Sequence, residues 1–205
     1  LAFVSQAAMV LFPALRQSKE GEMLSFYRAS RDVLGLAFPA MYLLYFPVVW
    51  LLGMWLPAYA ESLRYFAWLI PICVFDSKMN ITCTTLFKVR REEAKLLRIN
   101  VVTTALCALM VLLAVFGMGS VELAMASATA AIIGRSIYSE RIVSSELEAG
   151  QNDISFWELA LTVAFVASAL LLPTWFAVSA FATLYLAFLY AHRKRAISLG
   201  KALRG

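Results

Sequence analysis

The chain has 205 residues, of which 62% are hydrophobic and 15% are charged, and its formal net charge is +5. A soluble domain is about 45 to 50% apolar and about 25% charged, and it interrupts its apolar runs with polar residues. The composition therefore excludes a disordered tail, a disulfide-rich secreted module and an ordinary cytosolic enzyme. It predicts an all-α fold, a polytopic bundle of transmembrane helices.

The apolar runs predict about seven passes, because a membrane helix needs about 20 mostly apolar residues to cross about 30 Å of hydrocarbon. The sequence opens at Leu1 inside an apolar run without a basic leader or cleavage signal, so we expect a truncated first pass and a fragment of a longer chain. Pro173 separates the last two passes, because proline removes a backbone donor. The predicted passes are residues 1–15, 33–56, 65–87, 99–116, 120–139, 155–172 and 174–191.

The basic residues predict how the bundle is oriented. Most Lys and Arg residues fall in alternate connections and in the C-terminal tail, whereas the connections between them are nearly uncharged. Because positive charge marks the cytoplasmic side, we expect a multi-pass protein of the cytoplasmic membrane with a cytoplasmic C-terminus. The predicted regions are a lobe over residues 1–153, a terminal transmembrane hairpin over 154–191 and a basic tail over 192–205.

The third predicted pass carries the most informative residues, Asp76 and Lys78. A rise of about 1.5 Å per residue, counted from Tyr65, places both near the midplane of the bilayer. An ionised group there costs about 2.5 to 3.5 kcal/mol on insertion scales, so such groups face a bundle interior or a wet cavity. The two lie about 200° apart on a helix and need separate partners. Asp76 shares a face with Asn80, and both a cavity and structural ion pairs with other helices fit this pattern.

Interior prolines and a second pair of charges mark other passes. Pro39, Pro47 and Pro71 predict bends or hinges, which membrane helices tolerate when neighbours take up the freed carbonyl groups. Glu122 and Arg135 bracket the fifth pass, and we interpret both as interfacial, with the Arg135 stem reaching toward water. Small residues between them predict that this helix packs closely in the middle of the bundle.

The sequence contains none of the usual catalytic patterns, such as HExxH, GxSxG or a glycine-rich phosphate loop. Cys73, Cys83 and Cys107 lie in apolar runs, and we interpret them as core-filling thiols. The single histidine, His192, belongs to a basic membrane anchor. We therefore expect no enzymatic activity, no cofactor, no metal site and no nucleic-acid partner.

Three stretches together resemble the C-terminal half of polysaccharide flippases: AAMVLFPALRQSKEGE, RDVLGLAFPAMYLLYFPVVWLLG and TLFKVRREEAKLLRINVV. These flippases belong to the multidrug/oligosaccharidyl-lipid/polysaccharide exporter superfamily. The likeness covers about residues 5–145 and, in the last two passes, only the hairpin layout. It implies a bacterial inner-membrane protein that moves lipid-linked oligosaccharide by alternating access for cell-surface polysaccharide biosynthesis, together with an N-terminal lobe missing from this sequence.

The same resemblance implies a basic cavity that meets the substrate diphosphate. Lys78 is the position that fits, Arg135 is a second, and Asp76 balances this charge or binds a coupling Na⁺ or H⁺. Asn80 completes the predicted substrate-binding residues. Two alternatives stay open: a cation-coupled multidrug exporter of the same superfamily with Asp76 as its ion site, and a membrane assembly subunit whose charges pair with a partner. Membrane lipids are expected partners in each case.

Overall fold

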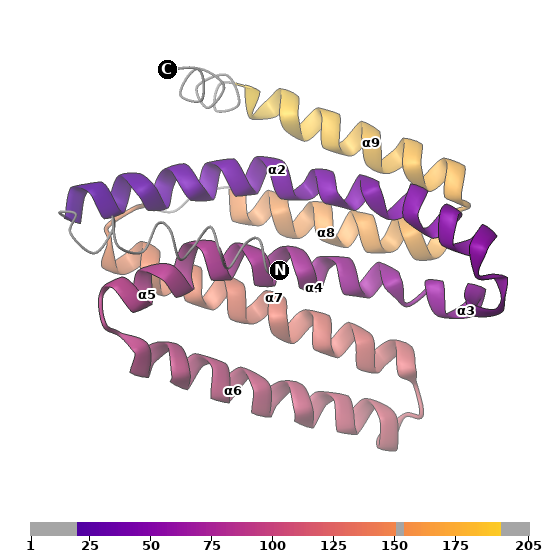
Figure 1. Cartoon of the computed structure of the whole chain (residues 1–205), viewed down its shortest axis with the longest axis horizontal. Helices are drawn as coiled ribbons and strands as arrows, with labels where there is room; N and C mark the ends of the chain where they lie inside the picture. The colour runs from indigo at the N-terminus through magenta and orange to yellow at the C-terminus, as the bar shows by residue number, and fades with distance from the viewer. Residues whose placement is uncertain (1–19, 151–153, 194–205) are drawn as a thin grey trace. The chain divides into compact units, whose positions relative to one another are not determined.

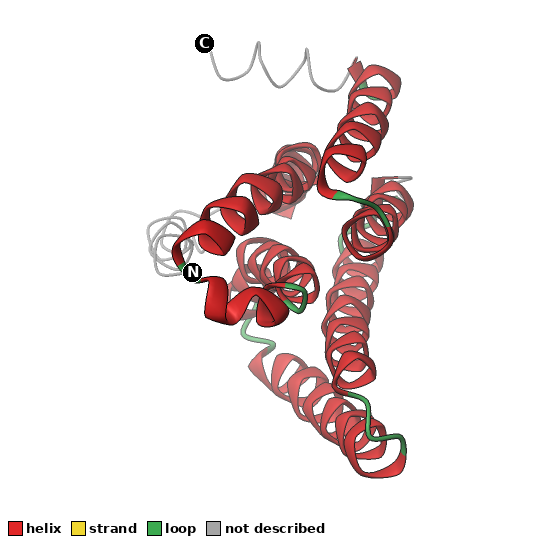
Figure 2. Ribbon diagram, turned by 90° about the vertical axis from the view of Figure 1, so that its right-hand side faces the viewer, coloured by secondary structure: helices red, strands yellow, loops and turns green. Residues whose placement is uncertain are grey.

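The structure is a computed structural model that describes residues 20–150 and 154–193. All regular structure in these residues is helical, as Figure 2 shows, which confirms the all-α prediction for them. The segments shown in Figure 1, in chain order, are α2 (Glu20–Trp55), the 3₁₀ turn η1 (Pro57–Tyr59), α3 (Ala60–Leu63), α4 (Phe66–Met79), the π-helical turn η2 (Asn80–Thr84), α5 (Thr85–Val89), α6 (Glu93–Leu112), the π-helical turn η3 (Leu113–Gly117), α7 (Val121–Glu146), α8 (Ile154–Leu171) and α9 (Thr174–Ala191).

The chain divides into two compact units that interleave along the sequence. Unit 1 contains Leu1–Arg31 and Pro71–Gln151, and unit 2 contains Asp32–Ile70 and Asn152–Gly205. Both α2 and α4 therefore contribute to both units. Residues 32–70, which the sequence assigned to the first lobe, belong to the unit that contains α8 and α9.

Unit 1 is built around a hairpin of α6 and α7, which lie side by side in Figure 1. Gly119 permits the connecting turn because its φ of +63° lies in the left-handed region. Ser120 then caps α7 by accepting a hydrogen bond from the backbone N of Leu123 at 3.3 Å. The apolar core of this unit consists of Tyr27, Met79, Cys83, Leu86, Phe87, Leu96, Ile99 and Val143.

Unit 2 has an aromatic core between α2, α8 and α9. The ring of Tyr42 stacks on Phe165 with centroids 4.6 Å apart and meets the edge of Phe181 at 5.8 Å. Its hydroxyl forms a hydrogen bond with Thr162 Oγ1 at 2.8 Å, so the polar end of this buried side chain has a partner. Pro173 lies directly before α9, which confirms the predicted break between the last two helices.

Among the described residues, three helices are long and apolar enough to span a membrane: Gly21–Trp55, Glu93–Gly117 and Thr174–Ala191. They correspond to the second, fourth and seventh predicted passes, the second of which ends one residue beyond its helix. The prediction of seven passes is therefore wrong, and the structure supports three.

The other predicted passes fail for different reasons. Residues 65–87 are divided between the 14-residue α4, the turn η2 and the short α5. Residues 120–139 lie in α7, whose acidic, basic and hydroxyl side chains make it too polar. Residues 155–172 correspond to α8 (Ile154–Leu171), whose described part, Phe156–Leu171, is a shorter apolar helix. Residues 1–15 lie outside the described residues.

The predicted hinges and thiols have mixed outcomes. Pro39 and Pro47 lie inside the 36-residue α2, which continues through both, and Pro71 lies inside α4. Their role as hinges stays a prediction. Cys83 is buried in the core as expected, but Cys73 is exposed, so the core-filling interpretation is wrong for that thiol.

Candidate functional site

The four predicted site residues come from two stretches of unit 1. Asp76 and Lys78 lie near the end of α4, Asn80 begins η2, and Arg135 lies in α7. Because residues 76 and 78 point about 200° apart on a helix, they meet different partners. The prediction that each charge needs its own neighbour is confirmed.

The Asp76 group consists of Asp76, Asn80, Asn100 and Arg135. The Asp76 carboxylate forms an ion pair with the Arg135 guanidinium, and Asn80 Nδ2 donates to Asp76 Oδ2 at 3.0 Å. Arg135 also donates to Asn100 Oδ1, on α6, at 3.4 Å. The side chains of Arg135 and Asp76 keep 20% and 30% of their surface exposed, so the group remains partly accessible.

This group brings together three of the four predicted residues. The Arg135 guanidinium binds Asp76 on α4 and Asn100 on α6, and its interfacial position stays a prediction. Sequence spacing could not show this contact, since Asp76 and Arg135 are 59 positions apart. Asn100 was not predicted, because it lies close to Glu93, Lys95 and Arg98 at the polar start of α6, where one more polar residue is not conspicuous.

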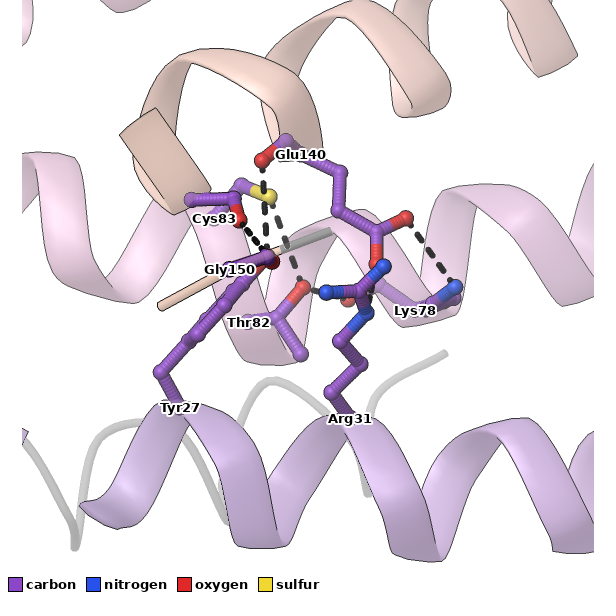
Figure 3. Close-up of polar contacts among 8 residues, drawn as sticks. Tyr27, Arg31, Lys78, Thr82, Cys83, Glu140 and Gly150 are labelled. Atoms are coloured by element: carbon purple, nitrogen blue, oxygen red, sulfur yellow. Dashed lines mark hydrogen bonds and ion pairs between the residues drawn. The ribbon is translucent and has the colours of Figure 1, made fainter. Parts of the chain in front are cut away.

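The Glu140 group consists of Tyr27, Arg31, Lys78 and Glu140. The Glu140 carboxylate lies between the two cations (Figure 3): Oε2 accepts from Lys78 Nζ at 3.1 Å, and Oε1 pairs with Arg31. Tyr27 Oη donates to the backbone carbonyl of Glu140 at 3.3 Å. These charged side chains are buried, with 4 to 6% of their surface exposed. The group therefore ties α2, α4 and α7 together inside unit 1.

Sequence reasoning missed Arg31 and Glu140. Arg31 counted only as one of the basic residues that set orientation, and Glu140 lay just past the predicted end of the fifth pass. Ser136, Glu140 and Val143 recur at helical spacing, which the sequence shows, and the structure shows that this face of α7 is buried. On α2, Tyr27 and Arg31 are likewise four residues apart and share a face.

Burial decides the energetic role of the two groups. Moving two charges out of water is costly, and their mutual attraction offsets that cost only when the geometry is good. A buried pair therefore adds little net stability, but removal of one partner is strongly destabilising, by about 3 to 5 kcal/mol. The Glu140 group is in this regime, whereas the Asp76 group, with its exposed surface, can exchange partners at lower cost.

A third ionic cluster lies at the end of the α6–α7 hairpin. Lys95 Nζ contacts Glu146 at 2.7 Å and Glu92 at 3.2 Å, and Arg90 lies 3.6 Å from Glu146. Burial alone would raise the pKa of Glu146, but the Lys95 hydrogen bond and the charges of Lys95 and Arg90 hold that pKa below its usual 4.5. This cluster fastens the α5–α6 turn to the end of α7.

The two polar groups of unit 1 differ in what they can bind. The Asp76 group contains partly accessible hydrogen-bond donors and acceptors, whereas the Glu140 group contains buried charges that are already paired. Within residues 20–150 and 154–193, no three His, Cys, Asp or Glu side chains gather in a way that could hold a metal ion. Comparison with protein-family models, curated proteins and solved structures finds no match to this chain. The resemblance to polysaccharide flippases therefore stays a prediction from the sequence.

Proposed function

We propose that this protein is part of a flippase that moves lipid-linked oligosaccharide across the cytoplasmic membrane of a bacterium by alternating access. The proposal unites the sequence resemblance with the three helices that can span a membrane. It includes a cytoplasmic C-terminus and a second lobe that completes the cavity. Membrane lipids and a coupling Na⁺ or H⁺ are its further partners.

The Asp76 group is the observation that carries this proposal. The group packs against α6, a helix that can span a membrane. Polar and charged side chains beside such a helix face a bundle interior or a water-filled cavity, because exposure to hydrocarbon is costly. Asp76 and Arg135 are paired and yet partly exposed. A hydrated cavity against this face of α4, α6 and α7 explains both properties, since water and substrate can reach the pair without its burial in lipid.

Within this proposal, Arg135 is better placed than Lys78 to meet the substrate diphosphate. Arginine binds phosphate oxygens through a planar fork of donors, and the Arg135 side chain is 20% exposed. Lys78 is only 3% exposed and is held by Glu140. We assign Lys78 to the fixed framework of the cavity wall, and the amides of Asn80 and Asn100 to hydrogen bonds with substrate oxygens.

The test measures export of cell-surface polysaccharide by variants of the protein in its host. Arg135→Gln should reduce export at least about tenfold, because a charge-assisted contact to phosphate contributes about 1.5 to 3 kcal/mol. Arg141→Gln is the matched control, since Arg141 is an exposed arginine of the same helix. Normal export by the Arg135 variant, with both proteins inserted equally, would remove Arg135 from the substrate site.

A membrane assembly subunit is the second candidate. The sequence predicted charges that pair with a partner, whereas Asp76 and Lys78 form ion pairs within this chain, so in this reading the pairs only hold the fold together. The exchanged variant Asp76→Arg with Arg135→Asp separates the two functions. A scaffold needs only the pair, so the exchange should restore activity that either single change abolishes. A flippase needs the cation where the substrate passes, so export should stay lost although the protein folds. A multidrug exporter would instead show drug efflux that depends on Na⁺ or H⁺ and is lost in Asp76→Asn.

A further inference from the structure

A π-helical turn interrupts the helix that carries both polar groups. The turn η2 begins at Asn80, two residues after Lys78, and joins α4 to α5. A π turn closes with i→i+5 hydrogen bonds, so it contains one residue more than the α-helical turn that it replaces. Because the extra residue is accommodated inside the turn, the helices on either side keep their facing directions. Such turns are frequently found at functional sites.

Threonine hydroxyls bind the carbonyl groups around this turn. Thr82 Oγ1 donates to the Lys78 carbonyl at 2.7 Å, and Thr85 Oγ1 donates to the Asn80 carbonyl at 3.1 Å. Thr82 and Thr85 are buried, where a carbonyl without a donor is costly, and their hydroxyl groups reduce that cost. Pro71 lies upstream in α4 and lacks an N–H donor, so the hydrogen-bond ladder is also interrupted there. The stretch with Asp76 and Lys78 thus lies between two places where the α-helical hydrogen bonding is interrupted.

We propose that the π turn moves from Asn80–Thr84 toward Pro71 and that this movement exchanges the partners of Asp76 and Lys78. Each residue that the turn passes moves into the position of the residue before it. This movement rotates its side chain by about 100° around the helix axis and shifts it by about 1.5 Å along the axis. Ser77 then takes the place of Asp76 opposite Arg135, and Lys78 takes the place of Ser77, away from Glu140. Both ion pairs break in one step.

The arrangement in the structure is the resting state of this switch, because a buried pair such as Lys78–Glu140 is costly to break. The moved arrangement is a minor state that a ligand or ion can populate by binding it better. The inference deepens the proposed function and rests on it for its purpose, since alternating access needs an element with two discrete states. Its structural test does not depend on transport.

The test follows the reactivity of one engineered thiol in the whole chain. Val74→Cys is introduced after the native residues Cys73, Cys83 and Cys107 are replaced by alanine. Val74 is only 6% exposed at rest, and when the turn reaches Pro71 it takes the position of residue 73, which is exposed in the structure. The rate of reaction with a membrane-impermeant maleimide therefore reports the population of the moved state.

Two matched pairs of variants change that population in opposite directions. Deletion of Ile81 removes the extra residue of η2, so an α-helical turn replaces it and no π turn remains to move. Deletion of Val115 removes the extra residue of η3 in the same way and is the control. Thr85→Val removes the hydroxyl that holds the turn in place. Thr183→Val is its control, because Thr183 Oγ1 makes the same kind of bond in α9, to Ser179 O at 2.7 Å.

We expect Thr85→Val to accelerate labelling about fivefold, the factor that one hydrogen bond contributes, and deletion of Ile81 to slow it. Both controls should leave the rate unchanged. If the labelling rate is unchanged in both test variants, the proposal of a moving turn is wrong. If the Ile81 deletion does not fold, the comparison of Thr85→Val with Thr183→Val decides alone. Export measured in parallel separates the two proposals. Altered labelling in a protein that exports no glycan refutes the proposed function but not the moving turn. Unchanged labelling in a protein whose export depends on Arg135 refutes the moving turn but not the proposed function.

Discussion

At the scale of single residues, Glu140 on α7 contacts three residues of two other helices, α2 and α4. Its carboxylate pairs with Lys78 and Arg31, and its backbone carbonyl accepts from Tyr27. Three elements therefore depend on one side chain. The low exposure of the group means that these contacts are made away from water, where loss of a partner is most costly.

We predict that Glu140→Gln destabilises the protein by about 3 kcal/mol or more, because it removes the negative charge from a buried group that contains two cations. The measurement is the temperature at which half of the detergent-solubilised protein is lost from the monodisperse peak. Glu148→Gln serves as the control, since Glu148 is exposed and such surface changes stay within about 0.5 kcal/mol. Equal melting of the two variants would show that the Glu140 group is dispensable for folding.

At the scale of elements, the helices follow from local chemistry, whereas their polar contacts do not. Ser120 after Gly119 starts α7, and Pro173 separates α8 from α9, so those boundaries can be read from the chain. The π turn at Asn80–Thr84 could not be predicted. One extra residue in a turn leaves the hydrophobic pattern on either side intact, and only the packing of both sides against neighbours reveals it.

The ionic cluster at the end of the hairpin gives this element a pH dependence. The folded-state pKa of Glu146 lies below 4.5, so its stabilising contribution is complete above the unfolded-state pKa and is lost as the pH falls through the folded value. We predict that Glu146→Gln lowers the melting temperature at about pH 7 and that the difference vanishes toward about pH 3. The comparison uses melting curves of both proteins across this range. A difference that is constant with pH would contradict the ionic origin.

At the scale of the whole molecule, α6 presents the strongest case for contact with lipid. Its span Glu93–Gly117 is apolar, and only 11% of its most apolar window is buried inside the protein. Leu97 and Leu106 are 64% and 51% exposed. In water such a surface would drive aggregation, whereas in a bilayer it faces acyl chains.

We predict that Leu106→Lys impairs membrane insertion, because Leu106 lies about 20 Å along the span and a lysine near the centre costs about 2.5 to 3.5 kcal/mol. Leu97→Lys should be tolerated, since it lies near the basic end of α6, where the ammonium can reach water. The amounts of each variant in the membrane fraction and in aggregates are the measurement. If α6 lies in water, both exposed substitutions will be harmless, and the membrane assignment of this helix fails.

The amino-acid sequence alone determined that the chain is helical and apolar and that Asp76 and Lys78 need separate partners, because composition and helical geometry are local properties. It overestimated the number of passes, because hydropathy does not show where a helix is interrupted or how long it stays regular. Only the tertiary structure decided the partners themselves: Arg135 for Asp76, and Glu140 with Arg31 for Lys78. Those residues are distant in the chain, and an ion pair forms wherever packing brings its charges together.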